Sequence, residues 1–264
     1  MSIFQTIILA IIEGITEFLP VSSTGHMIIA QKILAIESTE FVKAFTVNIQ
    51  FGAILSVVVL YWKRFFQSFD FYWKLMIAVA PALVLGYTFK NKIDMLLENI
   101  TVVAVMLVLG GVFMLFVDTW FKKTDEDQSM DWKRSLKIGF YQCIAMIPGV
   151  SRSMATIAGG MSTKLTRKNA AEFSFFLAVP TMAAASGYKL LKLFMDPVGK
   201  SILSENLMTL LIGNVVAFLV AMAAIKLFIS FLTKYGFKAF GYYRIVVGGA
   251  ILILLLLGVD LSIL

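Results

Sequence analysis

The sequence predicts an all-α, polytopic membrane protein with six transmembrane helices and two re-entrant helical hairpins. Of its 264 residues, 59% are hydrophobic and 15% are charged, whereas a soluble domain carries about 25% charged residues. Apolar stretches long enough to cross about 30 Å of hydrocarbon recur along the chain. Two further apolar regions are interrupted by proline and hydroxyl residues. We expect residues 1–264 to form a single membrane domain.

Six stretches are expected to span the membrane, because each is apolar over a sufficient length. They comprise residues 41–61, 73–90, 100–121, 171–193, 206–232 and 242–262. The two interrupted regions cover residues 3–36 and 136–161, and in each a proline, Pro20 or Pro148, ends one helix and permits another to begin. Irregular backbone at membrane depth needs protein or a wet cavity around it. We therefore expect two hairpins that return to the side from which they entered.

The two halves of the chain follow the same order, a broken hairpin and then three spans. We expect them to be repeats, with boundaries at residues 1–125 and 132–264. Because three is an odd number of spans, the second half would enter the membrane upside down, as in many transporters. Most lysines and arginines of this arrangement, Arg244 included, fall on one side, which the positive-inside rule makes cytoplasmic. Both termini would then face outward, and the hairpin tips would meet near the midplane.

Charge and cysteine content exclude two other classes of site. The net charge of +7 reports membrane orientation in a chain of this kind rather than nucleic-acid binding. The single cysteine, Cys143, excludes an intramolecular disulfide framework and a cysteine metal cluster. The remaining chemistry lies in two polar islands, which we read as one active site.

The first polar island extends from Glu13 to His26, the one histidine of the chain, and reads Glu-Gly-Ile-Thr-Glu-Phe-Leu-Pro-Val-Ser-Ser-Thr-Gly-His. Glu13 and Glu17 are four residues apart and share one helix face. Two neighbouring carboxylates repel in a low dielectric unless a cation separates them or one is protonated. The pair therefore suits Mg²⁺ or Ca²⁺ that also touches a phosphate. It equally suits one acid and one base.

The end of this island has the pattern of an anion site with an activated nucleophile. Ser22 is expected to cap the next helix, and the N–H groups of its first turn would bind an anion. Ser23 and His26 are three apart on one face. A hydroxyl beside an imidazole that a carboxylate orients is the arrangement of an activated nucleophile. The alternative is a histidine that only packs at the interface.

The second island, residues 148–156, adds an arginine at membrane depth. Arg152 is costly there, and its planar guanidinium matches a phosphate bidentately. Ser151 or Ser153 can cap a helix, and Gly149 permits close backbone approach. The alternative is an ion pair with a glutamate of the first island, which is compatible with phosphate binding if it forms when substrate is absent. The expected substrate-binding residues are Ser22, Thr24, Gly25, Gly149, Ser151, Ser153 and Thr156.

Both islands resemble the signatures of the bacterial undecaprenyl-diphosphate phosphatases of the bacitracin-resistance type, and the resemblance spans the chain. It implies removal of the terminal phosphate of undecaprenyl diphosphate, in an inverted-repeat homodimer of the bacterial plasma membrane whose site opens to the outer side. The functional positions that the resemblance assigns to this chain are Glu13, Glu17, Ser23, His26, Ser151, Arg152 and Thr156. Met154 departs from the family pattern, which has glycine there; its side chain would narrow the cavity or shift the helix start.

We expect in-line attack on the terminal phosphorus. Ser23 is the first choice of nucleophile, with His26 as base and Glu17 orienting the imidazole. Arg152 would hold the phosphate, and Glu13 would help Glu17 to hold a divalent cation. Direct attack by His26 or by water stays open. The alternative function is a flippase or transporter of a polyprenyl phosphate or small anion, because inverted repeats with broken helices are typical of transporters.

Overall fold

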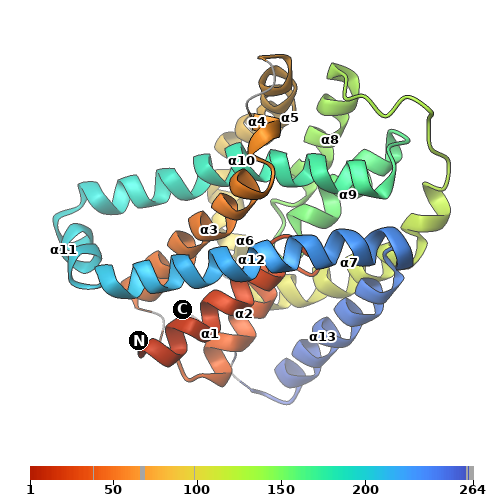
Figure 1. Cartoon of the computed structure of the whole chain (residues 1–264). Coiled ribbons are helices and arrows are strands. Elements are labelled where there is room, and N and C mark those ends of the chain that lie inside the picture. Colours follow the sequence, from red (N-terminus) through yellow and green to blue (C-terminus); the bar gives the residue numbers. More distant parts are fainter. Residues whose placement is uncertain (38, 66–68, 98, 260, 262–264) are drawn as a thin grey trace.

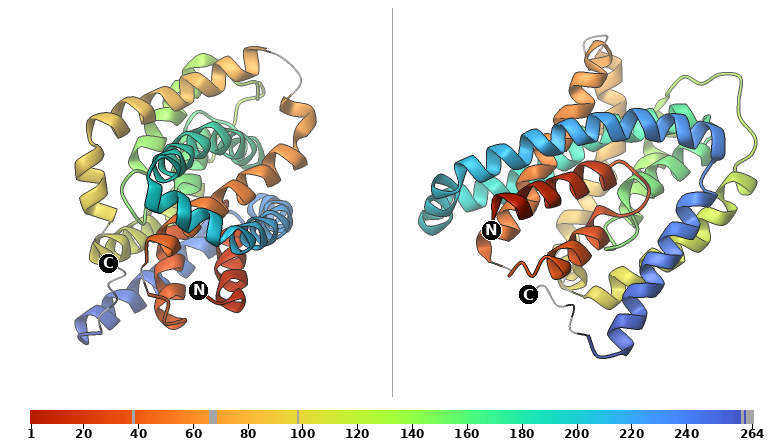
Figure 2. Two further views of the ribbon diagram at one scale, coloured as in Figure 1. Left: turned by 90° about the vertical axis from the view of Figure 1, so that its left-hand side faces the viewer. Right: turned by 60° about the horizontal axis from the view of Figure 1, so that its bottom comes forward.

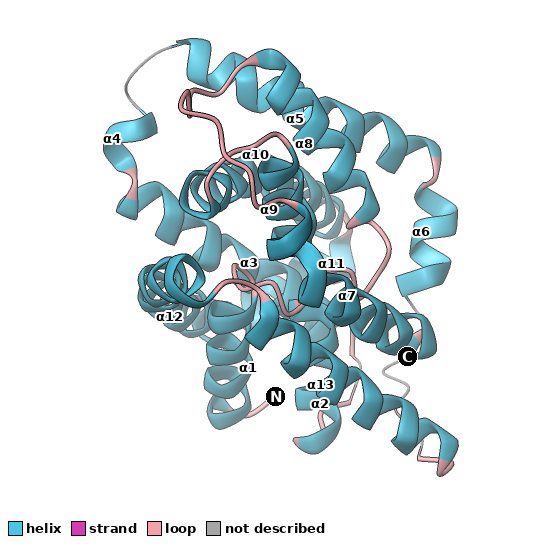
Figure 3. Ribbon diagram, turned by 90° about the vertical axis from the view of Figure 1, so that its right-hand side faces the viewer, coloured by secondary structure: helices cyan, strands magenta, loops and turns pink. Residues whose placement is uncertain are grey.

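The computed structural model describes residues 1–37, 39–65, 69–97, 99–259 and 261, and every regular element in these ranges is an α-helix (Figures 1 and 3). The helices are α1 (Ile3–Thr16), α2 (Ser23–Ile33), α3 (Glu40–Leu60), α4 (Trp62–Phe65), α5 (Phe69–Thr88), α6 (Lys90–Leu97), α7 (Ile100–Trp120), α8 (Trp132–Ile144), α9 (Arg152–Ser162), α10 (Arg167–Met195), α11 (Pro197–Glu205), α12 (Leu207–Tyr235) and α13 (Lys238–Leu256). The predicted all-α class is confirmed.

Within the described ranges, five helices are long and apolar enough to cross a membrane: α3, α5, α7, α12 and α13. They coincide with five of the six predicted spans, so the prediction of a multi-pass membrane protein is confirmed. The sixth prediction falls on α10, which has 29 residues and a length of about 43 Å at 1.5 Å per residue. α10 is less apolar than the others because lysines and arginines lie near both of its ends.

The two interrupted regions fold as helical hairpins. α1 packs against α2, and α8 packs against α9. Pro20 and Pro148 lie in the turns between the paired helices, where a missing N–H and a fixed φ favour a break. The first hairpin begins with a capping box, in which the Ser2 hydroxyl accepts from the Gln5 N–H and the Gln5 side chain accepts from the Ser2 N–H. The breaks therefore occur where the sequence predicts them.

The hairpins and the long helices have equivalent neighbours in the two halves of the chain. α1 lies along α12 (Figure 2), and α8 lies along α5. The third long helices of the two halves, α7 and α13, lie against each other, as do the first ones, α3 and α10. This packing brings the turn of each hairpin into the interior of the molecule.

Arg244 on α13 joins the turns of the two hairpins. Its side chain is fully buried. Nη1 donates to the Pro20 carbonyl at 3.2 Å and to the Val150 carbonyl at 2.9 Å. Nη2 donates to the Gly149 carbonyl at 2.6 Å. One guanidinium therefore fixes carbonyl groups from both turns.

The remaining donors of Arg244 bind α7. Nη2 also donates to the Met106 carbonyl at 3.0 Å, and Nε donates to the Leu107 carbonyl at 3.3 Å. Gly110 makes room for this contact, because a Cβ there would lie 2.3 Å from Nη2. All five N–H groups are thus satisfied. The sequence counted Arg244 among the basic residues of the predicted cytoplasmic side; in the structure its charge is buried among backbone carbonyls.

Replacing Arg244 by lysine should lower stability, because the three donors of lysine sit on one nitrogen and cannot span both turns as a planar guanidinium does, so buried turn carbonyls would lose their partner. Each orphaned carbonyl costs about 1–3 kcal/mol, so we expect the melting temperature to fall by about 5 °C or more. The measurement is thermal unfolding in detergent, with labelling of the thiol of the single cysteine, Cys143, as the readout of unfolding. Arg64→Lys, at an exposed arginine of α4, is the matched control. Equal melting temperatures for the two variants would contradict the role of Arg244.

Candidate active site

Each hairpin turn ends in a serine with the same unusual backbone conformation. Ser22 precedes α2 with φ 71°, and Ser151 precedes α9 with φ 74°. This left-handed conformation costs a non-glycine residue about 1–2 kcal/mol. The Ser151 hydroxyl accepts from the Met154 N–H at 3.3 Å, as a helix cap does. Ser22 has the predicted capping position, but among the described residues its hydroxyl makes no capping bond.

The first residues of α2 and α9 meet on one carboxylate. Oε2 of Glu17 accepts from the Ser23 hydroxyl at 2.9 Å. Oε1 of Glu17 accepts from Nη2 of Arg152 at 3.0 Å, and both side chains are largely buried. The structure therefore brings the two polar islands together, as the sequence predicts. It also forms the ion pair that the sequence offered as the alternative role of Arg152.

Two further contacts fix the plane of the Arg152 guanidinium. Nη1 donates to the Ser174 carbonyl on α10 at 3.1 Å. The guanidinium also lies over the Phe18 ring, 5.8 Å from its centroid. Nε is buried and, within the part of the chain that the structure describes, has no hydrogen-bond partner. Two of the five N–H groups of Arg152 are thus engaged among the described residues, which leaves others for an anion.

His26 faces α13 and not Ser23. Its Nδ1 lies 2.8 Å from the Ser22 carbonyl, and its Nε2 lies 2.6 Å from the Tyr243 hydroxyl. The expected arrangement, in which Glu17 orients the imidazole and His26 accepts from Ser23, is wrong for this structure, because Glu17 holds Ser23 directly. Sequence reasoning missed Tyr243, since a tyrosine within an apolar span, 217 positions from His26, carries no local sign of such a contact.

Glu13 places a second carboxylate beside the first. It is 2% exposed on α1, and its carboxyl group is a direct neighbour of that of Glu17. Its Oε1 has no partner among the described residues. Two carboxylates and the Ser23 hydroxyl are oxygen donors of the kind that Mg²⁺ and Ca²⁺ prefer. The described residues contain no group of three or more His, Cys, Asp or Glu that could hold a metal, so a cation here fits only with phosphate oxygens or water as further ligands.

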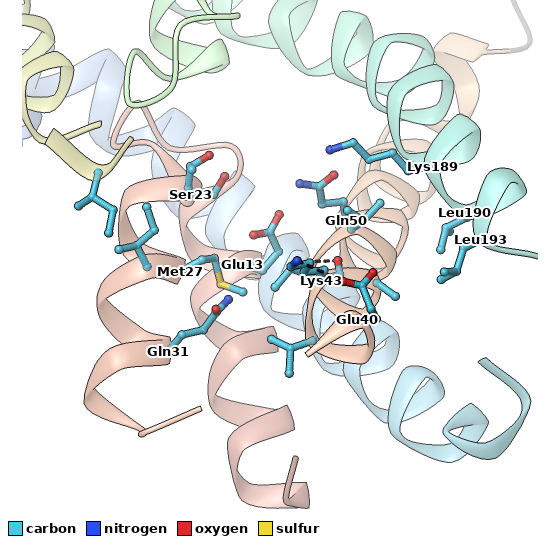
Figure 4. A pocket seen from close by; sticks show the side chains of 17 residues that line it. Glu13, Ser23, Met27, Gln31, Glu40, Lys43, Gln50, Lys189, Leu190 and Leu193 are labelled. Carbon is cyan, nitrogen blue, oxygen red and sulfur yellow. Dashed lines mark hydrogen bonds and ion pairs between the residues drawn. The ribbon is translucent and has the colours of Figure 1, made fainter. Parts of the chain in front are cut away.

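Two cavities share Ser23, Thr24 and Gln50 in their walls. The smaller, of about 200 Å³, is lined on its other side by Glu17 and Arg152. The larger, of about 510 Å³, contains Glu13, Ser23 and Gln50 at one end (Figure 4). Elsewhere its lining includes the apolar side chains Met27, Ile28, Leu190 and Leu193. The two cavities therefore adjoin at Ser23, Thr24 and Gln50, and each has both polar and apolar side chains in its lining.

Four of the seven expected substrate-binding residues line the smaller cavity: Ser22, Thr24, Gly149 and Ser151. Gly149 has φ 90°, and a Cβ there would lie 2.4 Å from the Val103 carbonyl, so both conformation and space require glycine. Its carbonyl is one of the groups that Arg244 holds. These positions are compatible with contact to a bound anion.

The other three expected substrate-binding residues serve packing in this structure. Gly25 lies against the side chains of α7. Ser153 is fully buried and donates to the Leu19 carbonyl at 2.8 Å, which links the two hairpins. The Thr156 hydroxyl is 2.6 Å from that of Ser174. None of the three is among the residues that line the two cavities.

His26 also lines neither of these cavities, although it lies within the described part of the chain. Met154 likewise lies outside them and packs in the main hydrophobic core. The expectation that its side chain narrows the cavity is therefore wrong. α9 nevertheless begins at Arg152, directly after the second turn.

The fold and the buried polar centre define a multi-pass α-helical membrane protein in which two broken hairpins share one site. Residues 6–250 match the family described as Bacitracin resistance protein BacA, so the chain belongs to that family. It is 56% identical to an undecaprenyl-diphosphatase of Porphyromonas gingivalis, with all of both chains covered. It is 59% identical to an undecaprenyl-diphosphatase of Flavobacterium psychrophilum, over 96% of each chain. With the undecaprenyl-diphosphatase of Aquifex aeolicus the identity is 42%, over 94% of this chain and 96% of the relative.

Met154→Gly should lower the stability of the protein by about 3–6 kcal/mol. The variant removes a buried side chain, which costs about 2–5 kcal/mol, and places glycine inside α9, which costs about 1 kcal/mol more. Met154→Leu keeps most of the volume and should cost less than about 1.5 kcal/mol. Chemical unfolding in detergent measures both variants. A glycine variant as stable as the parent would show that residue 154 does not pack in the core.

Proposed function

We propose that this protein removes the terminal phosphate of undecaprenyl diphosphate and produces undecaprenyl phosphate and inorganic phosphate. Its family and the names of its relatives support this reaction. The observation that carries it is the contact of Arg152 and Ser23 with Glu17. This contact places a guanidinium, a hydroxyl and a carboxylate at one cavity. A transporter needs only the anion-binding part of this set. The reaction recycles the carrier lipid of cell-wall synthesis and confers bacitracin resistance.

Phosphate binding begins at Arg152. Nε is without a partner among the described residues, and Nη2 is held only by Glu17. A terminal phosphate carries more negative charge than one carboxylate and matches this pair of donors bidentately. We infer that the phosphate takes over Nη2 from Glu17. The Glu17 carboxylate is then released from Arg152, while its Oε2 still faces the Ser23 hydroxyl.

Ser23 is the proposed nucleophile, with Glu17 in place of His26 as its base. The Ser23 oxygen forms a bond to the terminal phosphorus, its proton passes to Oε2 of Glu17, and the bridging P–O bond breaks. Undecaprenyl phosphate leaves, and water then hydrolyses the phosphoserine to inorganic phosphate and free Ser23. Arg152 and the N–H groups at the starts of α2 and α9 stabilise the charge of the transition state. His26 remains in the proposed catalytic set, and the labelling experiment below separates attack by Ser23, His26 and water.

A divalent cation, Mg²⁺ or Ca²⁺, completes the proposed site. Glu13 and Glu17 would hold it, because their carboxyl groups are neighbours and Oε1 of Glu13 has no other partner among the described residues. The cation would supply charge neutralisation for the phosphate oxygens.

The proposed topology has six spans, with α10 as the sixth, and two re-entrant hairpins in inverted repeats of residues 1–125 and 132–264. Support comes from the shared conformation of Ser22 and Ser151 and from the equivalent packing of α1 on α12 and α8 on α5. Both termini would face outward, and the site would open to the outer side of the bacterial plasma membrane. The lipid substrate would reach it from the surrounding bilayer. A homodimer is part of the proposal.

The detergent-purified protein should release phosphate from undecaprenyl diphosphate, and a chelator should suppress the release. Arg152→Ala should lower the rate by about 100-fold or more, since lost transition-state contacts of about 3 kcal/mol have this effect. His26→Ala should also lower the rate, because it removes the group that holds the Ser22 carbonyl directly before Ser23. Arg134→Ala breaks an ion pair with Asp125 in the linker and should retain the parental rate. The measurement is colorimetric phosphate release from folded variants. No release from the parent protein with any divalent cation, together with lipid translocation in liposomes, would favour the transporter alternative.

Substrate labelled with ³²P in its terminal phosphate should leave label on Ser23 after rapid acid quench, because the proposed intermediate is a phosphoserine. Ser23→Ala should carry no label. Peptide mapping of the labelled protein is the measurement. Label on His26, which is acid-labile and requires an alkaline quench, would replace Ser23 as the nucleophile. An absence of label under both quench conditions would favour direct attack by water.

A further inference from the structure

We propose that Tyr243 on α13 is a positioning residue for the reaction and acts through His26. This inference rests on the proposed phosphatase function. The Tyr243 hydroxyl lies 2.6 Å from Nε2 of His26. The two rings are also stacked, with centroids 5.5 Å apart and an interplanar angle of 9°. One side chain therefore restrains the imidazole both within its plane and perpendicular to it.

The partners of the two ring nitrogens define the tautomer of a neutral His26. The Ser22 carbonyl can only accept a hydrogen bond, so Nδ1, 2.8 Å away, carries the proton. Nε2 is then an acceptor, and the Tyr243 hydroxyl donates to it. Without this donor, only the bond to Ser22 would fix the ring. The Ser22 carbonyl thus selects the tautomer, and Tyr243 fixes the orientation of the ring through its other nitrogen.

The position of His26 bears directly on the proposed nucleophile. The carbonyl that Nδ1 holds belongs to Ser22, which has the strained left-handed conformation directly before Ser23. Ser23 in turn donates to Glu17. A continuous series of contacts therefore leads from the Tyr243 hydroxyl through His26 and the Ser22 backbone to the hydroxyl that reacts.

The next residue of α13 restrains the same turn from its other end. Arg244 donates to the Pro20 carbonyl, two residues before Ser22. Two consecutive residues of α13 thus hold the turn of the first hairpin, one through a buried guanidinium and one through an imidazole. The Tyr243 side chain is partly exposed, so apolar packing alone does not require its hydroxyl.

The test compares Tyr243→Phe with Tyr242→Phe. The first variant removes the hydroxyl and keeps the stacked ring. The second alters the adjacent and more exposed tyrosine of the same helix. We expect Tyr243→Phe to lower kcat by about 10-fold, equivalent to about 1.4 kcal/mol, with KM changed less than about twofold. Tyr242→Phe should retain the parental kcat and KM. Parental values for both variants would overturn the proposal.

A double-mutant cycle separates action through His26 from a general structural effect. In a His26→Ala background, Tyr243→Phe should cause no further loss of kcat, because the group through which it acts is gone. A further loss as large as that in the parent would overturn the proposal, since Tyr243 would then act by another route.

The contact has a readout that does not depend on activity. His26 is the one histidine of the chain, so histidine-selective ¹⁵N labelling gives signals from one imidazole. The parent protein should show a protonated Nδ1 and a hydrogen-bonded, unprotonated Nε2, and Tyr243→Phe should shift the Nε2 signal. Identical Nε2 signals in the parent and Tyr243→Phe would overturn the contact.

The assay separates failure of the proposed function from failure of the positioning role. If the parent protein releases no phosphate, both fail. If the parent is active and Tyr243→Phe is unimpaired, only the positioning role fails.

Discussion

The structure depends on the burial of one guanidinium, that of Arg244, between the two hairpins. Its five donors bind carbonyls of α7 and of both turns. Turn carbonyls inside a membrane protein lack the partners that a continuous helix supplies, and an unsatisfied one costs several kcal/mol in hydrocarbon. Arg244 removes this cost for three of them at once. Two broken segments that would otherwise be unfavourable in the interior of the molecule can therefore meet there.

The polar centre follows from that meeting. Once the turns lie together, α2 and α9 begin side by side, and their first residues, Ser23 and Arg152, reach the same carboxylate of Glu17. Ser153 adds a second link, through its hydrogen bond to the Leu19 carbonyl of the other hairpin. Each half of the chain supplies only part of the set, so the site exists only when both halves are folded together. The partly apolar cavity beside it suits a substrate that combines a diphosphate with a lipid chain.

The sequence predicted the features that depend on local chemistry. The number of consecutive apolar residues identified the spans, because each polar residue in hydrocarbon adds its own unfavourable free energy. Proline identified the breaks at Pro20 and Pro148, since its missing N–H acts on its own helix. The rarity of charge in such a chain indicated that the two islands, with their glutamates and Arg152, form one centre. Four of the seven expected substrate-binding residues line its smaller cavity.

The sequence by itself determined the all-α membrane class, the broken hairpins and the islands of polar residues. Only the tertiary structure decided which groups touch: Glu17 accepts from Ser23, His26 contacts Tyr243, and Arg244 is buried between the two turns. The physical reason is that a buried polar group must find a partner but its own sequence neighbourhood does not specify which one. Helix packing makes that choice, between residues more than two hundred positions apart.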